Sequence, residues 1–499
     1  MRLAILALIA FLLLPLKPAA AVGGYDILFK PQNEWLNTPR PLTKEDAKGR
    51  MILLDFWTYG CINCMQVVPD LKKLEKEFGE RLLVIGVHSA KFSGEKGSKR
   101  ILAAAKRFGL EHPVVNDSSF DVWDGFNVNA WPTQVLLDHN GQVVARYAGE
   151  GHYAEIRADM AKLEKFVSKQ ETATDLKTLK DKSDNGGDLS FPARLSFARG
   201  TPFGDLLFVA DGGHNRVLGL TLAGEVKIVI GSGKEGAKDG SFDEAAFNNP
   251  RGFDVTKTGV YIADTGNHKL RFADFATKKV TTVAGTGKRG YDRRVSNEDA
   301  LKASLASPWD VQMMQDGRTL AIAMAGLHQL WMMDTQNGKV SVMAGTGKEY
   351  IDDGGALRSS LSQPSGLSLW GNTLYFVDAE TSSLRKIEKG SVSTLIGTGL
   401  FDFGLVDGAY PKAMMQHAQG LDTDAGRIFI ADTYNNALRT YDIKTGALST
   451  LHLKDGTLNE PGDVLKLGDT LYVADTNNHR IVKVDVKTGG IRPLAVKMP

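Results

Sequence analysis

MILLDFWTYGCINCMQVVPDLKKLEKEF, residues 51–78, carries the clearest structural pattern in the first part of the chain. It contains both cysteines of the sequence, Cys61 and Cys64, as a C-x-x-C pair. The apolar run before the pair predicts a buried strand, and the amphipathic run after it predicts a helix. Cys61 is therefore expected where a strand passes into a helix N-terminus, a position that stabilises a thiolate.

This placement predicts thiol–disulfide exchange. A Cys61 thiolate can attack a disulfide, and Cys64 can then resolve the mixed disulfide. Two other readings of the pair are weaker. A structural disulfide between these cysteines would close a loop too short to stabilise much. A zinc site needs about four ligands, and the sequence has only 2 cysteines, so no metal site is expected.

Several features of this stretch, and one later run, resemble the thioredoxin family. Asp55 matches the family's buried carboxylate, which helps to move protons, and Trp57 matches the tryptophan after its D-F pair. Pro69 matches the proline that kinks the family's helix. Residues 130–133, AWPT, resemble the cis-proline loop that faces the cysteine pair. The long segment before that loop is more like the exported TlpA-type and alkyl-hydroperoxide-reductase-like branches of the family.

The resemblance implies a redox site of nine residues. The catalytic residues would be Cys61, Cys64, Asp55 and Pro132. The substrate groove would be formed by Trp57, Tyr59, Ile62, Asn63 and Trp131. The Cys61–Cys64 disulfide would be redox-active, with no separate cofactor. Because GCINC replaces the usual W-C-G-P-C, the resemblance implies no particular reduction potential.

The N-terminal residues 1–21 predict a secretory signal. Arg2 precedes an apolar run over residues 3–14, and small residues at 19–21 follow. We expect cleavage after Ala21, with retention as an N-terminal anchor as the alternative. The body of the protein would then be exported, in a bacterium to the periplasm or the extracytoplasmic face. The formal net charge of +2 favours neither nucleic acid nor an anionic membrane as a partner.

At 499 residues the chain is too long for one thioredoxin-like domain. We expect that domain over residues 22–168, a polar linker over 169–188 and a repeat region over 189–499. The repeat region contains six copies of a strand, a polar corner and a second strand: LLFVADGGHNRVLGL, VYIADTGNHKLRFA, LAIAMAGLHQLWMM, LYFVDAETSSLRKI, IFIADTYNNALRTY and LYVADTNNHRIVKV. Most copies follow a P-x-G-like run. Four strands in each of six units predict an all-β six-bladed propeller.

The polar corners resemble those of NHL-repeat propellers. The D-x-x-N-H-[RK] pattern is complete at residues 264–269 and 475–480, and it is degraded in the third and fourth copies. His268, His328 and His479 share one repeat position, which favours packing between blades over metal binding. A thioredoxin-like domain followed by six such blades is the layout of NHL repeat-containing thioredoxin-like proteins.

Three functions follow from this layout. The first is an exported thiol–disulfide oxidoreductase that acts on a protein thiol or disulfide, with a further protein partner docked on the propeller face. The second is a non-enzymatic protein-binding scaffold with a redox-silent thioredoxin fold. The third, a hydrolase or lyase with a metal in the propeller channel, rests on fold analogy alone. A membrane would be a partner only if the signal were retained.

Overall fold

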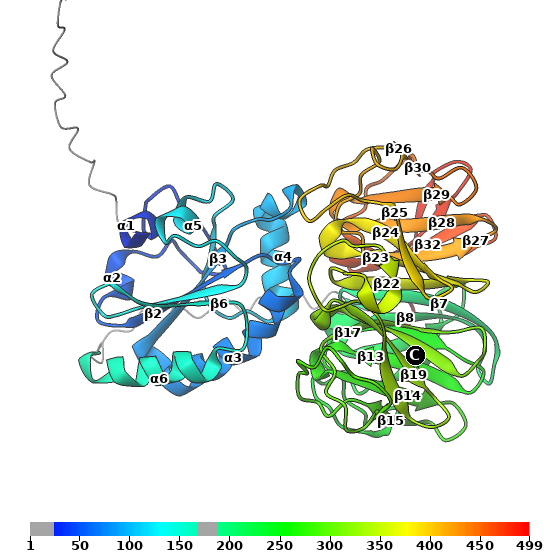
Figure 1. Cartoon of the computed structure of the whole chain (residues 1–499), viewed down its shortest axis with the longest axis horizontal. Helices are drawn as coiled ribbons and strands as arrows, with labels where there is room; N and C mark the ends of the chain where they lie inside the picture. The colour runs from blue at the N-terminus through cyan, green and yellow to red at the C-terminus, as the bar shows by residue number, and fades with distance from the viewer. Residues whose placement is uncertain (1–23, 168–186, 499) are drawn as a thin grey trace, which may run out of the picture.

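The computed structural model describes residues 24–167 and 187–498, which form two domains side by side (Figure 1). The expected signal over 1–21 and most of the expected linker over 169–188 lie outside the described residues. Within the described ranges, none of the helices combines the length and the apolar character needed to span a membrane.

The first domain is an α/β fold built on one six-stranded sheet of order β1-β4-β3-β2-β5-β6. Its strands are β1 Glu34–Leu36, β2 Met51–Trp57, β3 Leu82–His88, β4 Val114–Asn116, β5 Thr133–Leu137 and β6 Val143–Ala148. Its α-helices are α1 Gly24–Leu28, α2 Lys44–Ala47, α3 Ile62–Phe78, α4 Ser98–Phe108, α5 Asp121–Gly125 and α6 Tyr153–Leu163. Short 3-10 turns are η1 Gly79–Arg81, η2 Ser93–Lys96 and η3 Glu164–Phe166.

The central strand β2 ends shortly before the cysteine pair, so both cysteines lie where the C-terminal end of β2 leaves the sheet. We call this end of the sheet the cysteine edge. All seven of its residues are buried, because it lies between parallel β3 and antiparallel β5 with helices on both faces. β4 is an inner strand, because β1 pairs on its outer side. The N-cap of α4 is Gly97.

The second domain is a six-bladed β-propeller, as the repeats predict, and its third and fourth blades are complete despite their degraded corners. The first strands of adjacent blades contact one another around the ring. These first strands are β7 Pro192–Thr201, β12 Pro250–Val255, β17 Pro308–Met313, β22 Pro364–Trp370, β27 Gly420–Asp424 and β31 Pro461–Leu467.

Each first strand is followed by three antiparallel strands of the same blade. The second strands are β8 Gly204–Asp211, β13 Gly259–Asp264, β18 Thr319–Met324, β23 Thr373–Asp378, β28 Arg427–Asp432 and β32 Thr470–Asp475. The third strands are β9 Arg216–Leu220, β14 Lys269–Asp274, β19 Gln329–Asp334, β24 Ser383–Glu388, β29 Ala437–Asp442 and β33 Arg480–Asp485. The outer strands are β10 Val226–Ile230, β15 Lys279–Ala284, β20 Lys339–Ala344, β25 Ser391–Ile396, β30 Ala447–Thr450 and β34 Ile491–Leu494.

Short elements complete the blades. Two-residue strands on the outer edges are β11 Gly240–Ser241, β16 Glu298–Asp299, β21 Gly354–Gly355 and β26 Gly408–Ala409. The polar corners are the 3-10 turns η4 Gly212–His214, η5 Thr265–Asn267, η6 Ala325–Leu327, η8 Ala379–Thr381, η9 Thr433–Asn435 and η10 Thr476–Asn478, and η7 is Ala356–Arg358.

Buried aspartates tie five of the six corners to the approach to their own first strands. Asp264, for example, accepts the Asn248 backbone N–H at 2.8 Å and pairs with the fully buried Arg271 at 2.8 Å. In the third blade Met324 replaces the aspartate, and its Sδ accepts the Ala306 N–H at 3.3 Å instead. The corner therefore keeps its geometry where the sequence pattern is lost.

The ring closes through contacts between the last and first blades. The His479 imidazole Nδ1 accepts the backbone N–H of Phe191 at 3.2 Å. The segment after β34 also reaches the first blade, where Val226 N donates to Lys497 O at 3.1 Å and Lys497 N donates to Gly224 O at 2.8 Å. Among the described strands each belongs to a single blade, so these contacts join the ends of the ring.

Candidate functional site

Cys61 and Cys64 lie at the N-terminus of α3, as the sequence predicts. Cys61 is the N-cap residue and is partly exposed, whereas Cys64 is 2% exposed. Burial raises the pKa of the Cys64 thiol well above its ordinary value, and its hydrogen bond with Cys61 raises the pKa further. The two thiols thus differ in accessibility and in pKa: the Cys61 sulfur can be reached from solvent, whereas the Cys64 thiol is buried and favours its protonated form.

The buried carboxyl of Asp55 lies beneath the pair on β2. It accepts a hydrogen bond from Gln134 Nε2 at 2.9 Å, and it is close enough to Cys64 to raise that thiol's pKa. Burial raises the pKa of Asp55 to about 6, against the lowering effect of Gln134. A carboxyl with this pKa can gain or lose a proton near neutral pH.

The loop before β5 supplies the third part of the expected site. The Trp131-Pro132 peptide bond is cis. The Trp131 indole N–H donates to the Ser89 carbonyl at 2.9 Å. Trp131 and Cys61 both pack against one apolar cluster that includes Trp57 and Cys64. The structure therefore brings Cys61, Cys64, Asp55 and the Pro132 loop together at one edge of the sheet.

Six propeller residues lie on the surface that meets this edge, and we call them the rim residues. Each has a positive φ and precedes the first strand of a blade: Phe191, Asn249, Ser307, Gln363, His417 and Glu460. The backbone N–H of each donates to the corner side chain of the preceding blade, at Asn215, His268, His328, Ser382, Asn436 or His479. The three corner histidines thus join blades, as their shared repeat position predicts.

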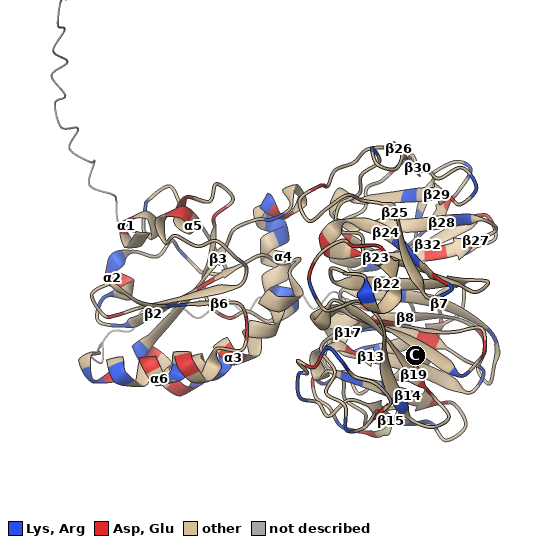
Figure 2. Cartoon of the chain, in the orientation of Figure 1, with Lys and Arg blue, Asp and Glu red and all other residues tan. Residues whose placement is uncertain are grey.

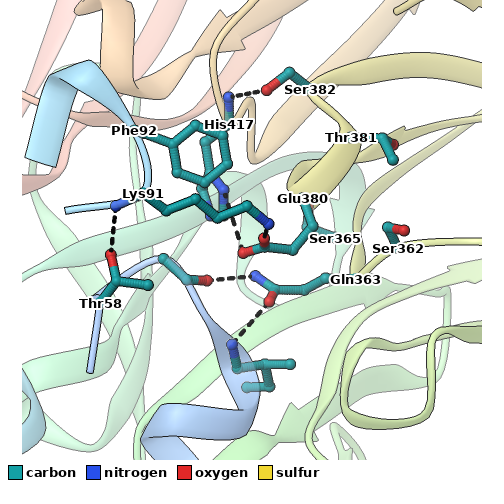
Figure 3. A network of polar contacts seen from close by, with 12 residues as sticks. Thr58, Lys91, Phe92, Ser362, Gln363, Ser365, Glu380, Thr381, Ser382 and His417 are labelled. Carbon is teal, nitrogen blue, oxygen red and sulfur yellow. Dashed lines mark hydrogen bonds and ion pairs between the residues drawn. The ribbon is translucent and has the colours of Figure 1, made fainter. Parts of the chain in front are cut away.

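The rim residue Gln363 holds the backbone on both sides of Cys61 (Figure 3). Its side-chain Nε2 donates to the Gly60 carbonyl at 2.9 Å, and its Oε1 accepts the Ile62 N–H at 2.8 Å. Ile62 is the first residue of α3, so its N–H has no partner within the helix. The propeller amide therefore fixes the backbone that carries Cys61.

Other rim residues contact the same edge. Glu460 accepts the Tyr59 hydroxyl at 2.7 Å and lies 3.7 Å from the Arg107 guanidinium. Ser307 accepts Gln66 Nε2 at 3.0 Å. His417 packs edge-on against Phe92, with ring centroids 5.0 Å apart. The propeller is thus docked onto the thioredoxin-like domain at its cysteine edge.

A buried glutamate shapes the loop before Cys61. Glu95 accepts the Gly60 N–H at 2.7 Å and the Phe92 N–H at 3.0 Å, and it also accepts the Thr58 hydroxyl. Burial raises the pKa of Glu95 to about 7 despite these hydrogen bonds. Its carboxyl therefore fixes the backbone of the loop that leads to the nucleophile.

A buried ion pair joins the domains beside this loop (Figure 3). Lys91 of the first domain pairs with Glu380 of the propeller, and both side chains are under a tenth exposed. Burial lowers the pKa of Lys91, but Glu380 and Glu349 raise it more, so the net shift is upward. Lys91 is also close enough to Cys61 to interact with it electrostatically. A fixed positive charge therefore stands near the exposed thiol.

The expected groove residues have unequal surroundings. Tyr59 is 0% and Ile62 is 3% exposed because the propeller covers them. Trp57 is buried within the first domain, edge-on to His88 at 4.9 Å. Asn63 and Trp131 are partly exposed. The role of these five residues in substrate binding stays a prediction.

Sequence reasoning missed the residues that link the two domains. Gln363, Glu380 and Glu460 lie in the repeats, and Lys91 and Glu95 lie in the polar loop after β3. One signal was available for the rim residues. They share one repeat position, yet their identities are Phe, Asn, Ser, Gln, His and Glu, whereas the prolines and glycines after them mostly repeat. Variation at one position of a regular repeat indicates contacts outside the repeat.

The fold and the site define a class of protein in which a thioredoxin-like domain is joined to a six-bladed propeller. Residues 49–143 match the family model described as Thioredoxin-like, so the first domain is a thioredoxin-like domain. The chain is 36% identical over 480 residues to NHL repeat-containing protein 2 of Gallus gallus, covering 86% of this chain and 65% of that protein. The predicted resemblance to NHL repeat-containing thioredoxin-like proteins is thus confirmed.

Two further relatives match different lengths of the chain. This chain is 37% identical over 445 residues to Protein SUPPRESSOR OF QUENCHING 1, chloroplastic, of Arabidopsis thaliana, and the match covers 85% of this chain and 42% of that protein. It is 35% identical over 101 residues to Thiol-disulfide oxidoreductase ResA of Geobacillus kaustophilus, covering 20% of this chain and 54% of that protein. The chain spans less than two thirds of the length of each of these relatives.

Proposed function

We propose that this protein is an exported thiol–disulfide oxidoreductase in which Cys61 is the attacking thiol and Cys64 the resolving thiol. The observation that carries the proposal is the asymmetry of the pair, with Cys61 partly exposed at the N-cap of α3 and Cys64 buried and hydrogen-bonded to it. An accessible sulfur that reacts first and a shielded one that reacts second are what thiol–disulfide exchange requires.

In the first step the Cys61 thiolate bonds to one sulfur of a substrate disulfide, and the other substrate sulfur leaves as a thiolate. In the second step Cys64 attacks the Cys61 sulfur. The Cys61–Cys64 disulfide forms, the second substrate sulfur leaves, and two electrons have passed to the substrate. Asp55 is suited to accept the Cys64 proton, because burial places the pKa of Asp55 at about 6.

Export and partners complete the proposal. The signal-like residues 1–21 support a periplasmic or extracytoplasmic location. A disulfide-bearing protein remains one class of substrate. A further protein partner, if one docks on the propeller, must use a surface other than the rim residues while these contact the thioredoxin-like domain.

The test uses the full-length chain. It is equilibrated in glutathione buffers of increasing oxidation, quenched with acid and alkylated, and its free thiols are counted by mass spectrometry. Wild type is expected to pass from two free thiols to none in one transition. Cys64→Ala is expected to accumulate a glutathione adduct on Cys61, whereas Cys61→Ala stays unmodified because Cys64 is 2% exposed.

A redox-silent scaffold is the second candidate, favoured by the way Gln363 covers the backbone around Cys61. It predicts that both thiols stay unchanged across the buffers and that Cys64→Ala forms no adduct. That outcome would refute the oxidoreductase.

A further inference from the structure

Asp55 is suited to accept the Cys64 proton, but it lies deep in the sheet and is 2% exposed. It is the single Asp, Glu, Lys or Arg residue in strands β2, β3, β4 and β5. Figure 2 shows the charged residues of this domain mainly on its helices, for example along α4 and α6. Because a bare charge is costly in such an apolar layer, a proton that leaves Asp55 needs polar groups along its way to solvent.

A buried histidine, His112, lies on the loop between α4 and β4, next to β3. Two hydrogen bonds hold this loop in place. Asn37 Nδ2 donates to the His112 carbonyl at 2.9 Å, and the Gly86 N–H donates to the Pro113 carbonyl at 2.9 Å. His112 is 4% exposed. The loop therefore fixes one imidazole against the strand that pairs with β2.

Gly86 leaves room for two ring nitrogens on the side of the sheet that carries Asp55. Asp55 pairs in register with Gly86 on parallel strands, and Trp57 is two residues after Asp55, so all three residues face one side of the sheet. A Cβ atom on Gly86 would lie 3.0 Å from Trp57 Nε1 and 3.5 Å from His112 Nε2. Both nitrogens are buried, and neither has a hydrogen-bond partner among the described residues.

Glu75 of α3 sets the tautomer of His112. Glu75 Oε1 lies 3.2 Å from His112 Nδ1. A carboxylate only accepts hydrogen bonds, so Nδ1 carries the hydrogen and Nε2 keeps its lone pair. The lone pair therefore faces the side of Asp55, whereas the N–H faces Glu75. The Glu75 side chain is 27% exposed, so this carboxylate reaches solvent.

The titratable groups around Asp55 are those that this arrangement brings together. Burial raises the pKa of Asp55 to about 6, and the hydrogen bond from Gln134 lowers it. Smaller effects come from His112, which lowers this pKa, and from Glu75, which raises it. On the other side, burial raises the pKa of Cys64, and the Asp55 charge adds to that effect. Asp55 thus stands between the resolving thiol and the His112–Glu75 pair.

We propose that His112 and Glu75 form a proton relay that connects Asp55 to solvent. The inference rests on the proposed function and adds two residues to its second step. In that step Cys64 attacks the Cys61 sulfur, and the second substrate sulfur leaves as a thiolate. The Cys64 proton passes to the Asp55 carboxylate, which must then release it before the next turnover.

The release runs from Asp55 to His112. One ordered water beside Gly86 can accept the Trp57 indole N–H. The same water can bond to the Asp55 carboxyl and to the imidazole Nε2, and about three partners are typical of a buried water. As the proton reaches Nε2, the Nδ1 proton passes to the Glu75 carboxylate, which releases it to bulk water. Asp55 is then a carboxylate again.

The test separates the two steps in a single turnover of the reduced full-length chain. The chain is mixed with excess glutathione disulfide, quenched with acid after increasing times and analysed by mass spectrometry. Loss of reduced protein reports the attack by Cys61, and closure of the glutathione adduct to the Cys61–Cys64 disulfide reports the second step. Near neutral pH, His112→Gln should slow the second step by about tenfold or more. Positioned proton transfer commonly contributes about a hundredfold or more, and Asp55 remains in this variant. The first rate, which also reports folding, should stay unchanged.

A second variant and the pH dependence distinguish a relay from a structural role. Glu75→Gln keeps a hydrogen-bond acceptor for His112 Nδ1 but cannot take up its proton, so it should slow the second step as well. Both deficits should shrink in alkaline buffer, where hydroxide accepts the Cys64 proton directly. His152→Gln is the matched control and should keep both rates, because His152 pairs with Glu155 at 2.7 Å on the surface of the same domain.

Equal second-step rates in wild type, His112→Gln and Glu75→Gln would overturn the relay and leave the oxidoreductase intact. A deficit that stays constant into alkaline buffer would overturn the relay too, because it would mark a structural defect. If wild type forms neither the glutathione adduct nor the Cys61–Cys64 disulfide, the proposed function itself fails.

Discussion

Gln363→Ala is expected to loosen the contact between the two domains without unfolding either one. The substitution removes the hydrogen bonds to Gly60 O and Ile62 N, at 2.9 and 2.8 Å. Gln363 is 1% exposed, so water cannot replace the amide while the domains stay docked. The bulk of the contact around Cys61 otherwise remains in place.

The size of the effect follows from the two backbone groups left without partners. A buried unsatisfied donor or acceptor costs about 1–3 kcal/mol, so two of them cost at least about 2 kcal/mol. Undocking returns both groups to water and removes that cost. The equilibrium between docked and undocked domains should therefore shift by roughly 30-fold or more toward undocking.

The assay compares the alkylation of Cys61 by a small and by a bulky reagent. Iodoacetamide can enter a docked interface, whereas a maleimide on a polyethylene glycol chain requires undocking. We expect Gln363→Ala to raise the rate of the bulky reagent by roughly 30-fold and the rate of iodoacetamide far less. Gln329→Ala is the control, since Gln329 bonds backbone carbonyls inside a blade at 2.9 and 3.0 Å. An unchanged bulky rate in folded Gln363→Ala would refute the reasoning.

Two further predictions concern buried charges. Burial raises the pKa of Asp55 from 3.8 to about 6, so the native state holds its proton to higher pH than the unfolded state. The free energy of unfolding of the reduced protein should therefore fall by about 3 kcal/mol as pH rises from about 4 through 6, and urea titrations of Asp55→Asn should lack that fall. Glu380→Gln leaves the Lys91 ammonium buried without its main partner, which should weaken docking by about 3–5 kcal/mol and enlarge the radius of gyration in X-ray scattering. Compactness should return in a Lys91→Met, Glu380→Leu double variant, and an unchanged radius in Glu380→Gln would contradict the prediction.

The parts of the fold that repeat a local pattern could be predicted from the sequence. The run of apolar residues in β2 and the period of α3 fixed the place of Cys61, because strand and helix periodicity depend on nearby residues. The six blades followed from the repeats for the same reason. Even the third blade was correctly expected, although Met324 stands where the other blades have aspartate.

The contact between the domains could not be predicted, because it depends on residues far apart in the chain. Gln363 is 303 positions from Gly60 in the sequence, and no local period links them. Glu95 was hidden for a different reason. A single acidic residue in a polar loop looks solvent-exposed, yet its carboxyl accepts several backbone N–H groups and is 0% exposed. Burial of a charge is set by tertiary packing.

The rim residues also bear on how such a molecule can change over time. Each has its backbone held by the preceding blade, through a neighbouring corner side chain that accepts its N–H. The side chain of a rim residue contributes little to holding the ring together, so it is free to differ. Evolution can therefore change the surface that the propeller contacts by substituting one rim residue at a time, while the propeller fold stays the same.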